Sequence, residues 1–136
     1  MSAATNPNLS ILPDLLAVCI LPSDSALPEW AFPGNFIALT RTTDELSVVC
    51  PQRYVPAEVK AEPNWRAFQV AGPLDFSLVG ILASIASPLA AVGISIFVIS
   101  TYQTDYILVK ESSLTQAVDA LIQAGFMVEN NVSIPS

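Results

Sequence analysis

Apolar residues along this chain form short runs separated by polar and proline-rich segments, which predicts several strands and few helices. Residues 8–22 are apolar and β-prone, and Pro13 divides them into a short edge piece and a stronger strand at 15–21. Residues 22–34 predict a loop with at most one helical turn, whose aromatic side chains we expect to cap the core. Residues 36–40 and 46–50 predict two strands joined by a polar hairpin.

The second half of the chain has a stronger pattern, which begins with a predicted strand at 65–72. Asp75 is a suitable N-cap for a helix that passes through Leu89 and ends at Gly93. Pro88 removes one backbone hydrogen bond, so we expect a kink or a restarted last turn there. This helix is apolar on nearly all sides, so we expect more than one neighbour to cover it.

A hairpin and a second helix complete this half. Residues 94–100 and 106–110 predict its strands, and Ser113 and Gln116 form a capping box for a helix that stops at Gly125. A last strand is predicted at 126–134. The order from Trp65 is β-α-β-β-α-β, so the predicted fold class is α+β, ferredoxin-like.

One predicted hairpin echoes the other. At a constant offset of 61 residues, taken from Thr40 to Thr101, the residues Thr40, Thr43 and Asp44 recur as Thr101, Thr104 and Asp105. Such an echo favours an internal duplication over chance. We therefore expect two units, a degenerate one at 1–64 and an intact one at 65–136. In the degenerate unit, prolines have reduced the helices.

Composition restricts the function more than the fold. The formal net charge is −7, which disfavours binding to nucleic acid. The sequence has no histidine and therefore lacks the commonest neutral-pH base and metal ligand. Cys19 and Cys50 lie in apolar runs and are interpreted as buried reduced thiols, with a disulfide as the alternative.

A membrane span is the alternative reading of residues 76–104, which carry no charge. Pro88, Gly93, several serines and acidic flanks argue against it. The first eight residues lack the basic start and apolar core of a signal peptide. We therefore expect a cytoplasmic protein without a membrane segment.

No catalytic equipment is visible. The acid pairs Asp44 with Glu45 and Glu58 with Glu62 have no histidine or nucleophile to work with and are interpreted as solvated charges. No glycine-rich phosphate loop is present. The sequence therefore predicts neither an enzyme nor a cofactor or metal site.

The string GPLDFSLVGILASIASPLAAVGISIFVISTYQTDYILVKE resembles the ACT-domain proteins of the CASTOR/GATS-like group and their small bacterial relatives. Those proteins pair two ACT units of the aspartate-kinase type. The resemblance covers roughly residues 65–128 and is looser before them. It implies a tandem ACT fold, a homodimer, and a small-molecule ligand, usually an amino acid, at an interface between units.

The resemblance also implies ligand contacts. They fall on the turn and helix start at Phe76, Ser77, Leu78, Val79 and Gly80, on the strand start at Ser95 and Ile96, and on the hairpin at Thr101, Tyr102 and Asp105. A helix N-terminus suits an α-carboxylate, and Asp105 beside the Thr101 hydroxyl suits an α-ammonium. Asp105 could instead be an ordinary turn residue, and Tyr102 could simply lie at a hairpin tip. Because Leu78 stands where the arginine sensors have an acid, a neutral or smaller ligand is favoured over arginine.

The sequence thus predicts a regulatory protein that binds an amino acid or similar metabolite and modulates a partner or its own assembly. The alternative is a structural protein–protein interaction module without a ligand. A small enzyme on the same fold is the third reading.

Overall fold

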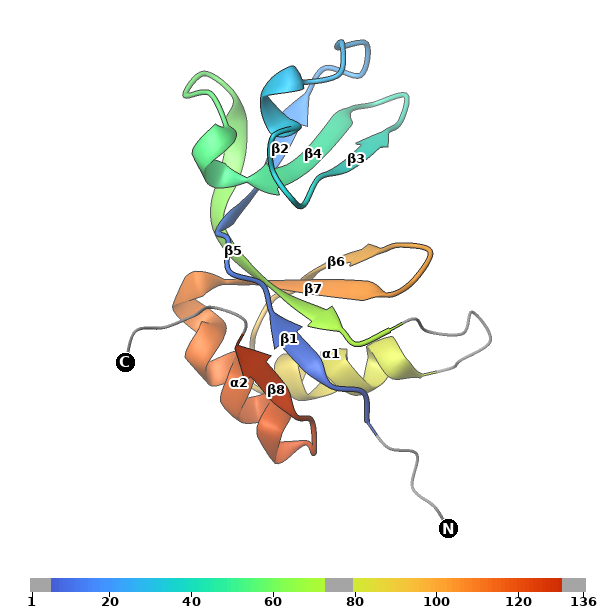
Figure 1. Ribbon diagram of the computed structural model, residues 1–136, viewed down its shortest axis with the longest axis vertical. Coiled ribbons are helices and arrows are strands. Elements are labelled where there is room, and N and C mark those ends of the chain that lie inside the picture. The colour runs from blue at the N-terminus through green and yellow to red at the C-terminus, as the bar shows by residue number, and fades with distance from the viewer. Residues whose placement is uncertain (1–5, 73–79, 131–136) are drawn as a thin grey trace. The chain divides into compact units, whose positions relative to one another are not determined.

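The computed structural model describes residues 6–72 and 80–130, and the chain divides into two compact units (Figure 1). Unit 2 comprises residues 14–65, and unit 1 comprises residues 1–13 together with 66–136. The first strand therefore belongs to unit 1, together with the C-terminal part of the chain. The division at residue 64 that we expect from the sequence would place it with residues 14–64 instead. The reason is pairing, because β1 (Leu9–Ile11) forms its ladders with the end of β5 and with β8.

Unit 1 has the predicted order of elements. After the end of β5 (Lys60–Val70) come α1 (Ile81–Ala91), β6 (Phe97–Ser100), β7 (Asp105–Lys110), a 3₁₀ turn η3 (Glu111–Ser113), α2 (Leu114–Gln123) and β8 (Val128–Asn130). The strand order is β6-β7-β5-β1-β8. This is the order of a ferredoxin-like βαββαβ unit with β1 inserted between its first and last strands. The α+β, ferredoxin-like prediction is confirmed.

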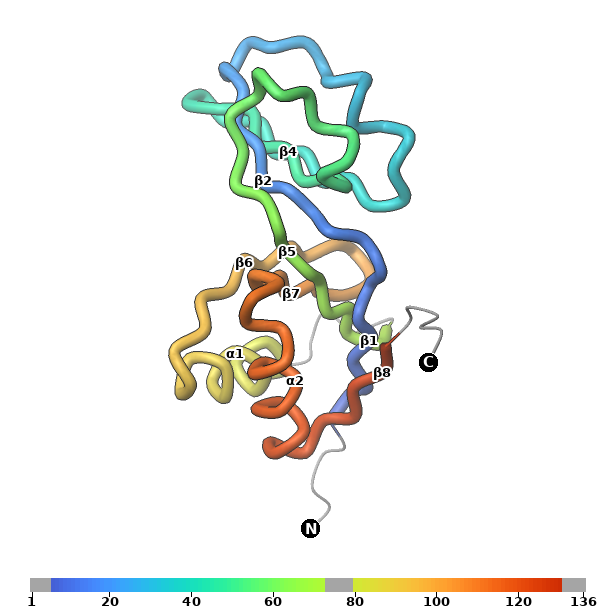
Figure 2. Tube along the Cα trace, turned by 90° about the vertical axis from the view of Figure 1, so that its left-hand side faces the viewer, coloured from blue at the N-terminus to red at the C-terminus, as the bar shows by residue number. Residues whose placement is uncertain are grey.

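The two helices pack side by side against one face of the unit 1 sheet (Figure 2). Between helices and sheet lies an apolar core. Its buried members are Leu9, Ile11, Phe68, Val70, Ile85, Leu89, Ile94, Ile107, Val109, Ala117, Leu121 and Phe126. Burial of this apolar face provides most of the stability that holds α1 and α2 in place.

Helix α1 begins later than predicted. It starts at Ile81 because Gly80 has φ 86°, a left-handed conformation that cannot continue a right-handed helix. Asp75, the predicted N-cap, lies outside the described residues. The helix continues through Pro88 to Ala91, so no separate last turn forms, and Gly93 with φ 78° follows its end as predicted.

Only one side of α1 is fully buried, at Ile85 and Leu89. The outer side carries small residues, and the exposed ones are Ala83, Ser84, Ser87, Ala90 and Ala91. In α2 the predicted capping box does not form. Ser113 makes no side-chain cap hydrogen bond, since the chain enters α2 through the η3 turn.

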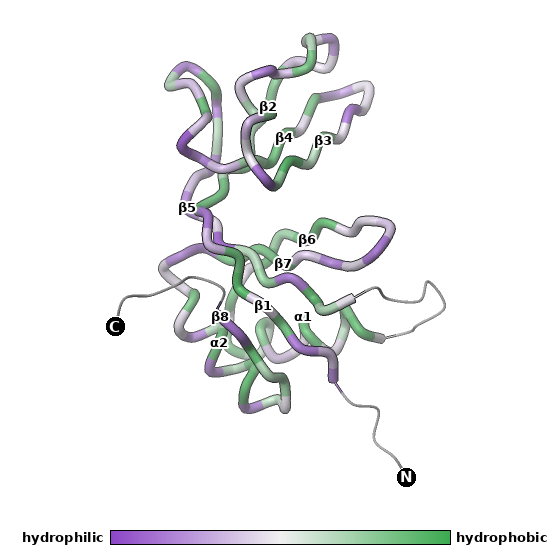
Figure 3. The backbone as a smooth tube through the Cα atoms, in the orientation of Figure 1, coloured by the Kyte–Doolittle hydropathy of each residue, from purple (hydrophilic) through white to green (hydrophobic). Residues whose placement is uncertain are grey.

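Unit 2 has a reduced version of the same strand order. Its elements are β2 (Leu16–Leu21), a 3₁₀ turn η1 (Glu29–Ala31), β3 (Ala38–Arg41), β4 (Leu46–Pro51), a 3₁₀ turn η2 (Gln52–Tyr54) and the start of β5. They are arranged β3-β4-β2-β5. This is the βαββαβ order with a 3₁₀ turn where each helix would lie. Strands β2 and β4 are largely hydrophobic along their length, whereas the β3–β4 turn is hydrophilic (Figure 3).

Trp30 packs against the unit 2 core as predicted, but Phe32 is 47% exposed and does not cap it. The buried residues of this core are Ala17, Cys19, Ala31, Leu46, Val48 and Cys50. The helical segments that would supply larger apolar side chains are replaced by loops, so this core is small.

Strand β5 begins at Lys60, five residues before the predicted start, despite Pro63. The pairing of β2 with β5 shifts register between Leu16 and Val18, which marks a bulge. A bulge accommodates proline because the ladder is interrupted there. Asn64 adopts φ 70° at this point, and its backbone N–H donates to Gln52 Oε1 at 2.7 Å while Gln52 Nε2 donates to its Oδ1 at 3.2 Å.

Cys19 and Cys50 are free thiols, both buried, on the neighbouring strands β2 and β4. Cys50 donates a hydrogen bond to the sulfur of Cys19, which raises the pKa of the Cys50 thiol and lowers the pKa of the Cys19 thiol. Burial raises the pKa of Cys50 further and offsets only part of the lowering at Cys19. The interpretation as buried reduced thiols is confirmed.

Gly34 is required by the close approach of Pro51. A Cβ atom on Gly34 would lie 2.6 Å from Pro51 Cδ and 2.7 Å from its Cγ. We expect Gly34→Ala to lower the free energy of unfolding by about 1–3 kcal/mol, because a rigid ring has to move. Urea denaturation followed by tryptophan fluorescence measures this. Asn35→Ala, at the exposed neighbour, should change stability by less than about 0.5 kcal/mol, and an equal loss in both variants would contradict the steric explanation.

The strand pairs align the two hairpins in a register different from the one that the sequence echo indicates. Their closing pairs are Arg41↔Leu46 and Ser100↔Asp105, so each turn has four residues and the offset is 59, from Arg41 to Ser100. Thr42 N donates to Glu45 O at 2.9 Å, as Thr101 N donates to Thr104 O at 2.8 Å. The 61-residue echo is therefore wrong by two residues.

Candidate functional site

Three segments of unit 1 lie at the same end of it, where β5 finishes, α1 begins and the β6–β7 turn lies (Figure 1). We call this the turn end of unit 1. It holds four of the residues that the sequence predicts as ligand contacts, namely Gly80, Thr101, Tyr102 and Asp105.

The turn after β6 is held by its own hydrogen bonds. Thr101 N donates to Thr104 O at 2.8 Å, and the Thr101 hydroxyl donates to the same oxygen at 3.1 Å. Thr104 N in turn donates to Thr101 Oγ1 at 3.3 Å. The hydroxyl hydrogen of Thr101 is thus engaged inward, which leaves a lone pair on Oγ1 that can accept a further hydrogen bond.

Asp105 pairs across the hairpin with Ser100. The Ser100 hydroxyl donates to Asp105 Oδ1 at 2.5 Å. A carboxylate accepts several hydrogen bonds, so this contact fixes the orientation of Asp105 and leaves capacity for a donor from a ligand. The alternative, an ordinary turn residue, would have the Asp105 side chain bond its own backbone. The hydrogen bond in the structure instead comes from a side chain of the paired strand.

The start of α1 offers backbone donors. Gly80 precedes the helix with φ 86° and supplies no side-chain cap, and its carbonyl accepts from Ser84 N at 2.9 Å. The first N–H groups of any α-helix have no intrahelical acceptor, and the helix dipole makes this end positive. Among the described residues, none would lie within 4 Å of a Cβ atom added to Gly80. This end can bind an anion such as a carboxylate.

The remaining predicted contacts are distributed differently. Phe76, Ser77, Leu78 and Val79 lie outside the described residues. Ser95 and Ile96 precede β6, whose four residues separate them from the turn by about 13 Å. Ile96 packs against the unit 1 core. Within this unit the structure therefore does not bring these two residues to the turn end.

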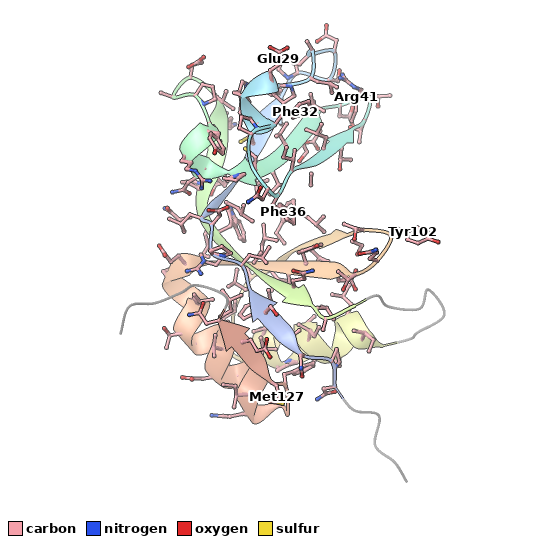
Figure 4. The ribbon with its side chains drawn as sticks, in the orientation of Figure 1. Glu29, Phe32, Phe36, Arg41, Tyr102 and Met127 are labelled. Atoms are coloured by element: carbon pink, nitrogen blue, oxygen red, sulfur yellow. The ribbon has the colours of Figure 1, made fainter. Side chains whose placement is uncertain are left out.

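Tyr102 is 82% exposed and projects from the tip of the turn, away from unit 1 (Figure 4).

Two residues of this site were missed in the sequence. Thr104 is 5% exposed and is the one buried polar side chain in the described part of the chain. Its hydroxyl donates to Val70 O at 2.6 Å, 34 positions away. Ser100 is the other, through its bond to Asp105. The sequence echo includes Thr104 but gives no sign of its burial.

Within residues 6–72 and 80–130 there is no group of three or more histidine, cysteine, aspartate or glutamate residues that could hold a metal ion. Over the same ranges, none of the helices has the length and apolar character needed to cross a membrane.

Family comparisons match the chain in two parts. The model of the ACT domain matches residues 60–123, and a model described as an N-terminal domain matches residues 14–58. These matches overlap the two structural units.

Relatives of known sequence and structure agree. The cytosolic arginine sensor for mTORC1 subunit 1 is 45% identical in Rattus norvegicus and 47% in Mus musculus, in an alignment of 107 residues that covers 74% of this chain. The chain spans 30% of the length of these relatives. A solved protein from Agrobacterium tumefaciens is 37% identical, with a TM-score of 0.90 over 98% of this chain and 99% of that one.

The fold alone extends further. The regulatory subunit of aspartate kinase from Thermus flavus has a TM-score of 0.61 at 12% identity, over 89% of this chain and 99% of that chain. With the ferredoxin-like order of unit 1, these similarities lead to one conclusion. The chain belongs to the ACT-domain family, in its CASTOR/GATS-like group.

Proposed function

We propose that this chain is a non-catalytic regulatory protein that binds a free amino acid at the turn end of unit 1 and modulates a partner protein. The observation that carries the proposal is the presence, at the same end of unit 1, of a helix start at which Gly80 supplies no side-chain cap and of a carboxylate held in a hydrogen-bonded turn. The name of the mammalian relatives, which are arginine sensors, supports an amino acid as the class of ligand.

The two ends of an amino acid suit the two parts of this site. Its α-carboxylate would accept hydrogen bonds from the first N–H groups of α1, where the helix dipole favours negative charge. Its α-ammonium would donate to the Asp105 carboxylate and to the lone pair of Thr101 Oγ1. Neither group needs a metal or a cofactor.

We propose a homodimer as the working form and the cytoplasm as its location. The outer side of α1, with its alanines and serines, would permit close approach of a second copy. A ligand bound at the turn end of unit 1 would then change how the dimer meets its partner. We also propose that unit 2 is a degenerate ACT copy, which the strand order β3-β4-β2-β5 supports.

A thermal-shift screen of the twenty standard amino acids tests this function. A ligand at a hundredfold excess over its Kd stabilises the native state by about 2.7 kcal/mol, so one or a few amino acids should raise Tm. We expect neutral amino acids to do so and arginine to give a smaller shift, because Leu78 replaces the acid expected to hold a guanidinium.

A flat screen would contradict the proposal and favour a structural interaction module. Turnover of any amino acid by the purified protein would contradict the non-catalytic assignment. Sedimentation of the same sample tests the homodimer, which a monomer at every concentration would exclude.

A further inference from the structure

Thr104 is unusual among the described residues of unit 1 because its polar side chain is buried. It is 5% exposed, and its hydroxyl donates to the carbonyl of Val70 at 2.6 Å. Val70 is the last residue of β5, beyond which the chain runs toward α1. This one bond therefore ties the β6–β7 turn to the strand that leads to the other half of the candidate site.

The turn does not need this bond in order to close. In unit 2 the equivalent turn also has four residues and the same closing backbone bond, from Thr42 N to Glu45 O at 2.9 Å. Its position equivalent to Thr104 is Glu45, which is not buried. A four-residue turn thus forms in this chain without a buried hydroxyl, so the Thr104 hydroxyl has a role other than making the turn.

The carboxylate is absent from unit 2 as well. The residue equivalent to Asp105 is Leu46, which is 1% exposed and belongs to the unit 2 core. The residue equivalent to Ser100 is Arg41, whose guanidinium donates to the carbonyls of Ser23 and Ser25. The buried hydroxyl, the carboxylate and the serine that orients it therefore occur together in unit 1 and are all missing in unit 2.

We propose that Thr104 is a positioning residue for ligand specificity, which holds Asp105 where it recognises the α-ammonium of the amino acid. The inference rests on the proposed function. Thr104 immediately precedes Asp105, so the anchored hydroxyl fixes the backbone from which the carboxylate extends. Ser100 then fixes the carboxylate, through the 2.5 Å bond to Oδ1. Thr104 touches no ligand and acts through Asp105.

The test compares two probes on the full chain. The first is the amino acid that stabilises the wild type most in the screen, and the second is the 2-hydroxy acid with the same side chain, which keeps the carboxylate but lacks the ammonium. Titration calorimetry gives Kd for both. In Thr104→Val the shape is kept and the hydroxyl is lost, so affinity for the amino acid should fall about tenfold while affinity for the hydroxy acid stays within about twofold.

Two further variants separate positioning from folding. Thr104→Ser keeps the hydroxyl and should restore the discrimination between the two probes. Thr43→Val removes an exposed threonine hydroxyl from the unit 2 hairpin and should leave both affinities unchanged. Far-UV circular dichroism confirms that each variant is folded before titration.

The outcomes distinguish the two proposals. If the wild type binds neither probe, the proposed function fails and the positioning role fails with it. If the wild type prefers the amino acid and Thr104→Val keeps that preference, or loses affinity for both probes alike, only the positioning role of Thr104 is overturned.

Discussion

Phe68→Ala is expected to lower the free energy of unfolding of unit 1 by about 3–5 kcal/mol, as large-to-small changes at buried aromatic positions do. Phe68 lies on β5 opposite Ile11 of β1, is 0% exposed and is among the largest fully buried side chains. Its replacement leaves a cavity in the core between sheet and helices, which a close-packed interior fills only in part. For a marginally stable protein this is a large fraction of the total.

The two units carry different spectroscopic signals, so the effect can be assigned. Both α-helices of the described chain lie in unit 1, and circular dichroism at 222 nm reports their unfolding in urea. Both tryptophans, Trp30 and Trp65, lie in unit 2, and their fluorescence reports that unit. Phe68→Ala should move the dichroism transition to lower urea concentration.

Phe32→Ala is the matched control, the same chemical change at a residue that is 47% exposed. It should change the free energy of unfolding obtained from the fluorescence transition by less than about 1 kcal/mol, because truncation of an exposed ring removes little buried apolar area. Equal destabilisation by the two variants would mean that Phe68 does not occupy the core position that the fold assigns to it.

The order of elements was predictable because its signals are local. Alternating apolar runs mark the strands, and glycines mark helix ends, as Gly93 and Gly125 do with φ 78° and 99°. The start of α1 was not predictable in this way. Asp75 has the chemistry of an N-cap, whereas Gly80 adopts a positive φ that ends the helix at its N-terminal side. The sequence alone does not show that this glycine adopts such a conformation.

The start of β5 was missed for a related reason. Pro63 normally argues against a central strand, and only the bulge next to it makes the strand possible. That bulge is held by the amide pair between Gln52 and Asn64, twelve residues apart. A contact of this kind depends on the folded arrangement and leaves no periodic trace in the sequence.

The places of the candidate residues in the fold were predictable, but the hydrogen bonds that connect them were not. The resemblance indicated Thr101 and Asp105, and the structure places both on one hydrogen-bonded hairpin. The burial of Thr104 depends on a carbonyl 34 residues earlier, which no local pattern reveals. That the N-terminal strand β1 belongs to unit 1 likewise follows from strand pairing between distant segments.

Asp105→Asn is expected to weaken amino-acid binding about 10- to 150-fold, the range that corresponds to a hydrogen bond between charged groups of about 1.5–3 kcal/mol. The change keeps the size of the side chain, and the amide oxygen can still accept the hydrogen bond from Ser100 that the carboxylate accepts at 2.5 Å. What it removes is the negative charge that would face the α-ammonium. Titration calorimetry with the amino acid that binds the wild type most tightly measures the loss.

The control for this change is Asp44→Asn, the same substitution at an exposed acid in the β3–β4 turn of unit 2. It alters the net charge by the same amount, so a general electrostatic effect would weaken binding equally in both variants. We expect binding to be lost only in Asp105→Asn, with the urea transitions of both variants close to those of the wild type. If Asp105→Asn binds as the wild type does, the ammonium is recognised elsewhere, and the site proposed at the turn end of unit 1 is wrong even if the protein binds an amino acid. The pair of variants thus tests the location of the site separately from the existence of a ligand.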